Sequence, residues 1–205
     1  MVVVIDYGAG NLRSVVNAIA VLGYESRVTN DPAVVETATS VILPGVGAAA
    51  DTMAGLKAKG LPEVICRYIA GGRPFLGVCI GLQVLFSGSE EGGWQDCLGV
   101  IPGKVERFPP GLKVPHMGWN QVRQLKNHSL FRDIPDSTNF YFVHSYFGVP
   151  EDKSIIAGVT EYGVSFPSVL VRGNLMATQF HPEKSGAAGL RLYDNFLALA
   201  GEQKR

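Results

Sequence analysis

The first half of the chain alternates short, wholly apolar runs with longer amphipathic segments. Residues 2–5, 41–43 and 75–78 contain no charged or amide side chain and are rich in Val, Ile, Leu and Phe. Runs of this kind are typical of strands buried on both faces, and a parallel sheet is their usual setting. We therefore expect these three segments to be strands of such a sheet.

Helical patterns lie between and after these strands. Asn11 is a suitable N-cap for a helix that stops at Gly23, and its apolar positions share one face: Val15, Val16, Ile19 and Leu22. A second helix is expected to end at residues 71–72, with apolar positions Val64, Ile65, Tyr68 and Ile69. Residues 80–86 are also expected to be helical. This alternation predicts an α/β fold with an open, mostly parallel sheet and helices on both faces.

The second half of the chain has a different rhythm, with short strands separated by Gly and Pro. The expected strands are residues 105–108, 140–147, 155–160 and 169–180, the last broken by a hairpin turn at residues 172–174. A final amphipathic helix is expected over residues 185–200, with Leu190, Tyr193, Leu197 and Ala200 on one side. Because no repeat or low-complexity linker divides the halves, we expect an antiparallel extension within a single domain, residues 1–205.

Composition narrows the functional classes. A length of 205 residues favours one domain, at about 150 residues per domain. Eighteen basic and eighteen acidic residues give no net charge, which argues against a protein that coats DNA. The N-terminus has neither the basic start of a signal peptide nor an apolar run long enough to span a membrane, so a cytoplasmic location is expected.

The strongest chemical signal is the segment Gly-Val-Cys-Ile-Gly at residues 77–81, between a predicted strand and a predicted helix. It is the cysteine counterpart of the G-x-S-x-G nucleophile elbow, in which a sharp turn exposes the middle side chain. The flanking glycines leave room for that turn, and the helix N-terminus stabilises a thiolate. Cys79 is therefore the candidate nucleophile, and a buried, inert cysteine is the alternative.

A cysteine nucleophile requires a base, and the base requires a group that orients it. His181 ends an apolar run, and Glu183 lies two residues later, where an extended chain directs both side chains the same way. The zinc deaminase signature also opens with His-x-Glu, but it requires Pro-Cys-x-x-Cys downstream and no cysteine follows residue 97, which excludes that class. We expect no metal and no cofactor. His144 lies in an aromatic strand and is expected to be structural or to line the site.

The segment Gly45-Val46-Gly47 follows a predicted strand and leaves three alternatives open. Its spacing fits G-x-G-x-x-A, but Pro44 occupies the turn and no acidic residue follows at the distance that ribose binding requires. Backbone N–H groups of such a turn can instead stabilise an oxyanion. A simple tight turn is the third alternative.

Five motifs in order resemble the class I glutamine amidotransferases. Three are general to that family: Pro-Gly-Val-Gly at 44–47, Gly-Val-Cys-Ile-Gly-Leu-Gln at 77–83, and Gln-Phe-His-Pro-Glu-Lys-Ser at 179–185. Two more, Pro-His-Met-Gly-Trp-Asn at 115–120 and Tyr-Phe-Val-His-Ser-Tyr at 141–146, are similar to the glutaminase subunits of imidazole glycerol phosphate synthases. The resemblance extends from Asp6 to Lys184.

The resemblance implies a mechanism and a role for each matching residue. Cys79 attacks the side-chain amide of glutamine, His181 transfers the proton to the departing nitrogen, and Glu183 orients His181. The backbone N–H groups of Val46 and Ile80 form the oxyanion hole. Glutamine is held by Gly47, Gln83, Glu91, Ser145 and Tyr146.

The resemblance also implies a partner, because one domain of this size leaves no part of the chain to use the ammonia. The implied partner is a (β/α)8-barrel cyclase in a 1:1 heterodimer. The cyclase forms imidazole glycerol phosphate and aminoimidazole carboxamide ribotide in histidine biosynthesis. The interface is expected to include Asn11, Trp119, Tyr141 and Lys184. The free subunit is expected to hydrolyse glutamine poorly.

Three other functions stay open from the sequence. A glutaminase could serve a different synthase, such as one that makes pyridoxal phosphate. A peptidase-like cysteine hydrolase would need no partner. A non-catalytic assembly subunit would keep the fold without using Cys79.

Overall fold

The structure is a computed structural model that describes residues 1–204. The first half contains, in order, β1 (Val2–Ile5), α1 (Leu12–Val21), β2 (Ser26–Thr29), α2 (Pro32–Thr37), β3 (Ser40–Leu43), α3 (Ala49–Ala58), α4 (Pro62–Ala70), β4 (Phe75–Val78), α5 (Ile80–Gln83), β5 (Phe86–Ser89) and β6 (Gln95–Asp96). The second half contains β7 (Ile101–Arg107), β8 (His116–Gln124), the 3-10 turn η1 (Ser129–Phe131), β9 (Thr138–His144), β10 (Tyr146–Pro150), the 3-10 turn η2 (Lys153–Ile155), β11 (Ile156–Glu161), β12 (Ser165–Arg172), β13 (Leu175–Thr178), the 3-10 turn η3 (Pro182–Lys184) and α6 (Gly186–Leu199).

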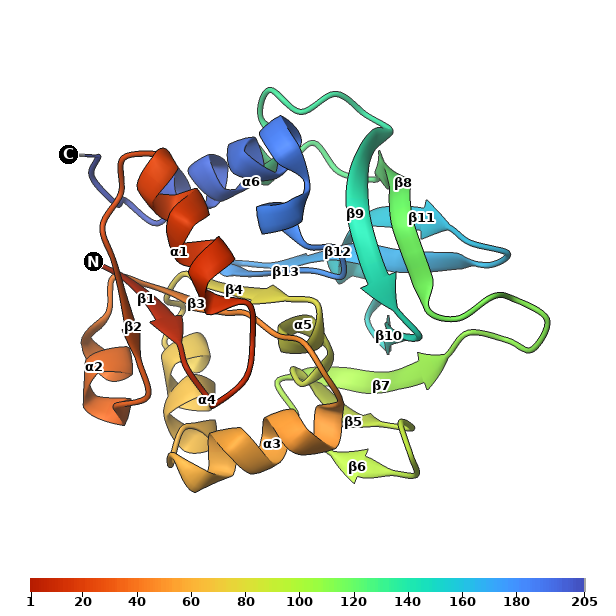
Figure 1. The fold of residues 1–205 in the computed structure, drawn as a ribbon, viewed down its shortest axis with the longest axis horizontal. Coiled ribbons are helices and arrows are strands. Elements are labelled where there is room, and N and C mark those ends of the chain that lie inside the picture. The colour runs from red at the N-terminus through yellow and green to blue at the C-terminus, as the bar shows by residue number, and fades with distance from the viewer. Residues whose placement is uncertain (205) are drawn as a thin grey trace.

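A nine-stranded sheet forms the centre of the molecule, in the order β2-β1-β3-β4-β13-β12-β11-β8-β9. The first five strands are parallel, and the remaining four continue the sheet in antiparallel fashion (Figure 1). This confirms the predicted α/β class with its antiparallel extension. The order also places β13, from late in the chain, directly beside β4, so that their carboxyl ends meet.

The alternation of side chains along β1 shows how both faces of the sheet are covered. Val2 and Val4 pack in one apolar cluster with residues of α1 and α6. Val3 and Ile5 face the opposite way and pack with residues of α2, α3 and α4. Figure 1 shows α1 and α6 above the sheet and α2 to α4 below it. Burial on both sides explains why these strands are continuously apolar.

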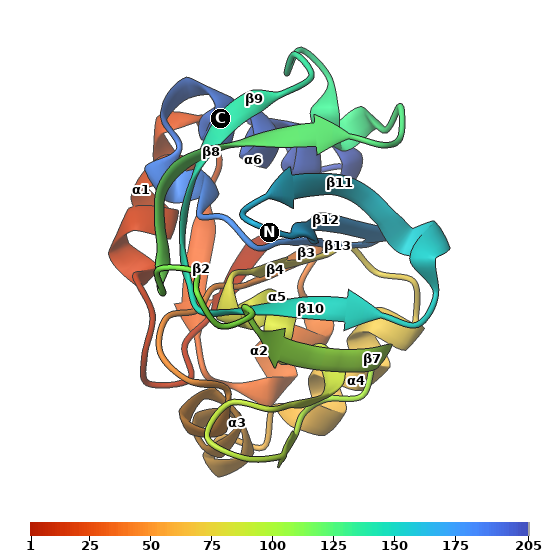
Figure 2. The ribbon, with the colours of Figure 1, turned by 90° about the vertical axis from the view of Figure 1, so that its right-hand side faces the viewer.

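A separate four-stranded sheet, in the order β10-β7-β5-β6, was not foreseen from the sequence. Figure 2 shows β7 and β10 running side by side below the main sheet. Two predictions were wrong for this reason. Residues 140–147 are not one strand, because the chain leaves the main sheet at Ser145 and enters the second sheet as β10. Residues 80–86 are helical only as far as Gln83, since Phe86 begins β5.

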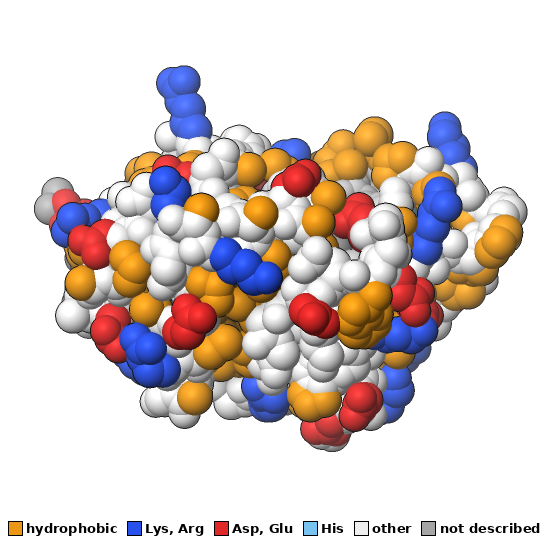
Figure 3. Space-filling model, turned by 90° about the horizontal axis from the view of Figure 1, so that it is seen from below, with side chains coloured by type: hydrophobic (Ala, Val, Ile, Leu, Met, Phe, Trp, Pro, Cys, Tyr) orange, Lys and Arg blue, Asp and Glu red, His pale blue; other side chains and the backbone are white. Residues whose placement is uncertain are grey.

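The other predicted elements agree with the structure. The hairpin at residues 172–174 joins β12 to β13, and α1, α4 and α6 lie where periodicity placed them. Among residues 1–204, no helix is long and apolar enough to cross a membrane. The face that carries α3 and α4 shows acidic and basic side chains intermixed (Figure 3), in keeping with zero net charge.

Candidate active site

Cys79 lies between the carboxyl end of β4 and the first residue of α5. Its backbone has φ 55° and ψ −107°, which a residue other than glycine rarely adopts. The Cys79 N–H donates to the Thr178 carbonyl at 2.7 Å, and the Cys79 carbonyl accepts from Leu82 N and Gln83 N. These bonds hold the strained turn from both sides. The predicted elbow is therefore present, although the helix after it is only four residues long.

The glycines on either side of Cys79 are required by close backbone contacts. A Cβ atom at Gly77 would lie 2.6 Å from the Gly81 carbonyl oxygen. A Cβ at Gly81 would overlap the carbonyl oxygen of Leu43, at the end of β3. The elbow can therefore pack against β3 only when both positions lack a side chain, as the sequence pattern predicted.

His181 and Glu183 reach the same place from the end of β13. His181 Nδ1 lies 2.8 Å from Glu183 Oε1, and each of the two side chains is only 2% exposed. The Tyr193 hydroxyl of α6 donates to the other Glu183 oxygen at 3.3 Å. Glu183 therefore fixes the imidazole with Nδ1 protonated and leaves Nε2 for the reaction. Nε2 is buried, and among residues 1–204 it has no hydrogen-bond partner.

The charges around His181 favour its protonated form. Burial lowers the pKa of His181, but the negative charge of the Cys79 thiolate and the hydrogen bond and charge of Glu183 outweigh it, raising the pKa to about 10. The direction follows from two anionic partners in a site with little water. His181 is therefore protonated at neutral pH and can act as a proton donor in the site.

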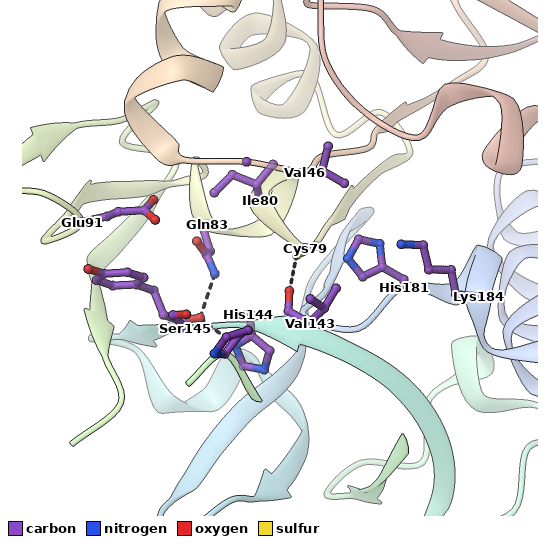
Figure 4. A pocket seen from close by; sticks show the side chains of 13 residues that line it. Val46, Cys79, Ile80, Gln83, Glu91, Val143, His144, Ser145, His181 and Lys184 are labelled. Carbon is purple, nitrogen blue, oxygen red and sulfur yellow. Dashed lines mark hydrogen bonds between the residues drawn. The ribbon is translucent and has the colours of Figure 1, made fainter. Parts of the chain in front are cut away.

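A pocket of about 370 Å³ opens beside Cys79 and is large enough for an amino acid. Its lining comes from several elements and includes most of the predicted site: Val46, Gly47, Cys79, Ile80, Gln83, Glu91, Ser145, Tyr146, His181 and Lys184. Figure 4 shows side chains from separate elements around the pocket, with Cys79 after β4, Glu91 after β5 and His181 after β13. Glu183 lies behind His181 and is not part of the lining.

The predicted oxyanion donors both border this pocket. Ile80 is the first residue of α5, so its N–H belongs to the helix-terminal amides that have no partner within the helix. Val46 is 37% exposed and precedes Gly47, whose φ of +97° turns the chain sharply. Beneath this segment lie the buried hydroxyls of Tyr7 and Thr52.

The dinucleotide alternative has no support. A pyrophosphate would bind at the N-terminus of α3, but there the Ala49 N–H already donates to the Glu91 carboxylate.

Glu91 and Gln83 each have a structural contact that the sequence did not reveal. One Glu91 oxygen accepts from the Ala49 N–H at 2.9 Å and so caps α3. The Gln83 amide nitrogen donates to the Tyr146 carbonyl at 2.8 Å and to Gln179 Oε1 at 3.1 Å. Both side chains still border the pocket, where their remaining oxygens can face a substrate ammonium.

Two buried histidines, His116 and His144, lie next to the pocket and hydrogen-bond to one another. β8 pairs with β9 so that His116 lies opposite His144. His144 donates from Nδ1 to the Tyr146 carbonyl at 2.8 Å, and its Nε2 accepts from His116 Nδ1 at 3.1 Å. Each imidazole is thus neutral and in one tautomer, because a carbonyl can only accept. Burial lowers the pKa of His116 to about 4 and that of His144 to about 3. His144 also borders the pocket, so both parts of the expectation that it is structural or lines the site agree with the structure.

The four residues expected at an interface lie near the same edge of the molecule. The Trp119 and Tyr141 rings meet edge to face at 6.1 Å, and Lys184 Nζ lies 5.9 Å from the centre of the Tyr141 ring. Trp119 is 58% exposed, so its ring is available for contact with a partner. Asn11 precedes α1, which contacts η3, the turn that carries Lys184.

Gln179 is a buried polar residue of the site that sequence reasoning did not assign. It is fully buried, and its amide nitrogen lies 3.7 Å from Cys79 Sγ. The sequence offered one signal for Gln179, its position two residues before His181. This position indicates a contact with Cys79 only once β13 is known to lie beside β4, and the sequence does not show that pairing.

Comparison with known proteins agrees with this geometry. The family model of class I glutamine amidotransferases matches residues 3–199. The imidazole glycerol phosphate synthase subunit HisH of Dehalococcoides mccartyi strain CBDB1 is 55% identical over 205 residues, all of both chains. The protein of the same name from Moorella thermoacetica is 54% identical over 195 residues, covering 95% of this chain and 93% of its own.

Solved structures show the same fold at lower identity. A crystal structure of a glutamine amidotransferase superimposes with a TM-score of 0.77 at 22% identity, covering 98% of this chain and all of the other. The structure of PurLQS from Thermotoga maritima gives a TM-score of 0.75 at 17% identity and 97% coverage of both chains. From the family match over nearly its whole length and these full-length relatives, this chain belongs to the class I glutamine amidotransferases.

Proposed function

We propose that this chain is the glutaminase subunit of an imidazole glycerol phosphate synthase in histidine biosynthesis. The observation that carries the proposal is the meeting of Cys79, His181 and Glu183 at one amino-acid-sized pocket. The name shared by full-length relatives that are more than 50% identical supports the choice of synthase.

In the first half-reaction the Cys79 thiolate attacks the amide carbon of glutamine. The Val46 and Ile80 N–H groups stabilise the oxyanion of the tetrahedral intermediate. The His181 imidazolium then gives its Nε2 proton to the amide nitrogen, the C–N bond breaks, and ammonia leaves a γ-glutamyl thioester on Cys79.

In the second half-reaction water replaces ammonia. His181, now neutral, takes a proton from the water as it attacks the thioester, and the C–S bond breaks to release glutamate. The thiolate and the imidazolium are restored. Glu183 holds the imidazole in the required tautomer throughout, through its contact with Nδ1.

The substrate is bound by groups that suit a zwitterion. Glu91 supplies a negative charge for the glutamine ammonium, and the backbone at Gly47 faces the pocket beside it. Gln83, Ser145 and Tyr146 complete the wall, and they are held in place by the hydrogen bonds to the Tyr146 carbonyl.

The proposed partner is a (β/α)8-barrel cyclase that binds in a 1:1 complex over Asn11, Trp119, Tyr141 and Lys184. Ammonia released into water at neutral pH is mostly protonated and is no longer a nucleophile. A partner docked over the edge that holds the pocket would receive it unprotonated. The exposed Trp119 ring supports this placement, because it meets the half-buried Tyr141 ring, which in turn lies near Lys184 of the pocket.

The test measures formation of imidazole glycerol phosphate by the chain mixed with the cyclase and its nucleotide. Wild-type chain is expected to support synthesis from glutamine, and Cys79→Ala to support synthesis only from added ammonium salts. If Cys79→Ala keeps full glutamine-dependent synthesis, the chain is a non-catalytic assembly subunit. Co-purification with a different synthase instead of the cyclase would assign another acceptor.

Dependence on the partner is measured separately. Glutaminase turnover of the chain alone is expected to be far below turnover with the cyclase and its nucleotide, because Val46 must present its N–H to the pocket. Equal rates would remove this switch and leave the glutaminase assignment unchanged.

A further inference from the structure

Gln179 connects the nucleophile to the wall of the pocket. Its backbone N–H donates to the Ser168 carbonyl of β12 at 2.9 Å, which holds the segment after β13 against the sheet. Its side chain is completely buried between Cys79 and Gln83. The Nε2 group is a donor to Cys79 Sγ at 3.7 Å, and Oε1 accepts from Gln83 Nε2 at 3.1 Å.

The direction of the Gln179 amide is determined by its neighbours. The Tyr146 carbonyl can only accept, so the Gln83 atom 2.8 Å from it must be nitrogen. The second hydrogen of that nitrogen then points to an acceptor, which must be Gln179 Oε1. Gln179 is thereby left with its Nε2 hydrogens toward the sulfur, and a flipped amide would place two donors against each other.

Cys79 Sγ has a competing neighbour on its other side. The Val143 carbonyl lies 3.9 Å from Sγ and can accept only from a protonated thiol. Figure 4 shows this contact as a dashed line across the pocket floor. Gln179 Nε2 favours the opposite state, because a donor stabilises a thiolate more than a thiol. The amide therefore acts in the same direction as His181 and against Val143.

We propose that Gln179 is a positioning residue that holds the Cys79 sulfur for attack and stabilises its thiolate, with Gln83 locking the amide in the donating orientation. Its effect on the sulfur is independent of any acceptor of ammonia. Its effect on turnover rests on the proposed glutaminase function.

The main experiment compares alkylation of Cys79 by iodoacetamide as a function of pH in full-length wild type, Gln179→Glu and Gln179→Met. Mass spectrometry of the peptide containing Cys79 separates its reaction from those of Cys66 and Cys97. Gln179→Met removes the donor without adding charge, whereas Gln179→Glu keeps an acceptor for Gln83 but places a carboxylate beside the sulfur. The pH midpoint of alkylation is expected to rise by about one to two units in both variants, the scale of a hydrogen bond to a charged group.

Gln124→Met is the matched control. Gln124 also uses its amide nitrogen twice, for the Ile134 and Pro135 carbonyls, but it lies in β8 away from Cys79. Its alkylation midpoint is expected to equal that of wild type. A midpoint in folded Gln179→Met equal to that of wild type would overturn the proposal.

Kinetics with the cyclase complex provide a second readout. Gln179→Glu is expected to lower kcat for glutamine hydrolysis by about 10- to 100-fold while KM changes less than about threefold, since the lost contact is to the nucleophile. A rise in KM with unchanged kcat would overturn the positioning role. Absence of any glutamine hydrolysis by the wild-type complex would instead refute the proposed function, and the alkylation result would still stand.

A measurement on wild type covers the case in which the variants do not fold. The side-chain amide protons of Gln179, assigned by NMR, are expected to shift with pH in step with alkylation of Cys79. Those of Gln124 are expected not to shift. Gln179 protons that stay constant across that titration would contradict the proposed contact.

Discussion

The carboxylate of Glu183 lies 2.8 Å from Nδ1 of His181, and both residues belong to the same short turn after β13. The turn explains the contact: Pro182 begins η3, and the Lys184 N–H donates back to the His181 carbonyl at 3.0 Å. The sequence argument assumed an extended segment in which alternate side chains point the same way. The contact is correct, but a turn produces it.

This contact predicts a large loss of activity in Glu183→Gln. An amide can donate to Nδ1 and stabilise the wrong tautomer, so kcat is expected to fall by about 100-fold or more. Steady-state glutaminase assays with the partner measure this. Glu36→Gln, which removes an exposed carboxylate paired with Arg67, is the control and is expected to keep wild-type kcat. A loss below threefold in Glu183→Gln would contradict the orienting role.

Removal of the sulfur is expected to lower the pKa of His181. Burial lowers this pKa, and the Cys79 thiolate opposes it together with Glu183, giving about 10. In Cys79→Ala burial is opposed by Glu183 alone, so the pKa of His181 should fall by at least about one unit, as NMR titration of the imidazole would measure. Cys97→Ala is the control. An unchanged pKa in Cys79→Ala would show that the thiolate does not interact with His181.

The same raised pKa sets a pH window for stability. The folded state holds the His181 proton up to a pKa of about 10, whereas the unfolded chain releases it near 6.5. The stabilising contribution is therefore complete below pH 6.5 and is lost as pH rises toward 10. Urea unfolding of wild type and Cys79→Ala at pH 7 to 10 is expected to show an earlier loss in the variant.

The paired histidines predict the opposite dependence in acid. Burial lowers the pKa of His116 to about 4 and of His144 to about 3, so below pH 6.5 the unfolded chain binds protons that the folded chain does not. The free energy of unfolding is expected to fall by roughly 1–3 kcal/mol per pH unit between pH 6 and 4. His116→Gln should show a shallower slope in urea unfolding. Identical slopes would contradict the neutral pair.

The elbow glycines predict a local defect. In Gly81→Ala the new methyl group overlaps the Leu43 carbonyl, so the variant is expected to lose about 3 kcal/mol or more of stability, or to displace Cys79. Chemical unfolding and labelling of Cys79 by a glutamine-like electrophile measure the two outcomes. Gly71→Ala is the control, because Gly71 has φ −71° and room for a methyl group. Normal stability and labelling in Gly81→Ala would contradict the packing.

Trp119 is expected to anchor the partner. Trp119→Ala should weaken association with the cyclase by about 10-fold or more, as removal of an exposed aromatic anchor does. Trp94→Ala is a close control, because Trp94 is 60% exposed but lies by β5 and β6, away from Tyr141 and Lys184. Isothermal titration would measure both. Equal effects of the two substitutions would remove Trp119 from the interface.

The buried strands were predictable because their environment is uniform. Strand β1 is covered on both faces, so all four of its residues are apolar. Such a run identifies a buried strand without knowledge of the strands beside it. Strand β8 was missed because only part of one face is buried and Gly118, at φ 129°, interrupts it. Helix α3 was missed because few of its residues, chiefly Met53 and Leu56, enter the core.

The sequence by itself determined the sharp turn around the candidate nucleophile, because Gly77 lies against the Gly81 carbonyl only a few residues away. It also determined the three central strands of the first half, β1, β3 and β4, and the helices α1 and α4. The tertiary structure alone decided that β13 lies against β4, which brings His181 and Gln179 to the sulfur across a separation of about one hundred residues. It also decided that the chain changes sheets at Ser145, which builds the pocket wall. Pairing between distant strands depends on the burial of both partners at once, and no local pattern records it.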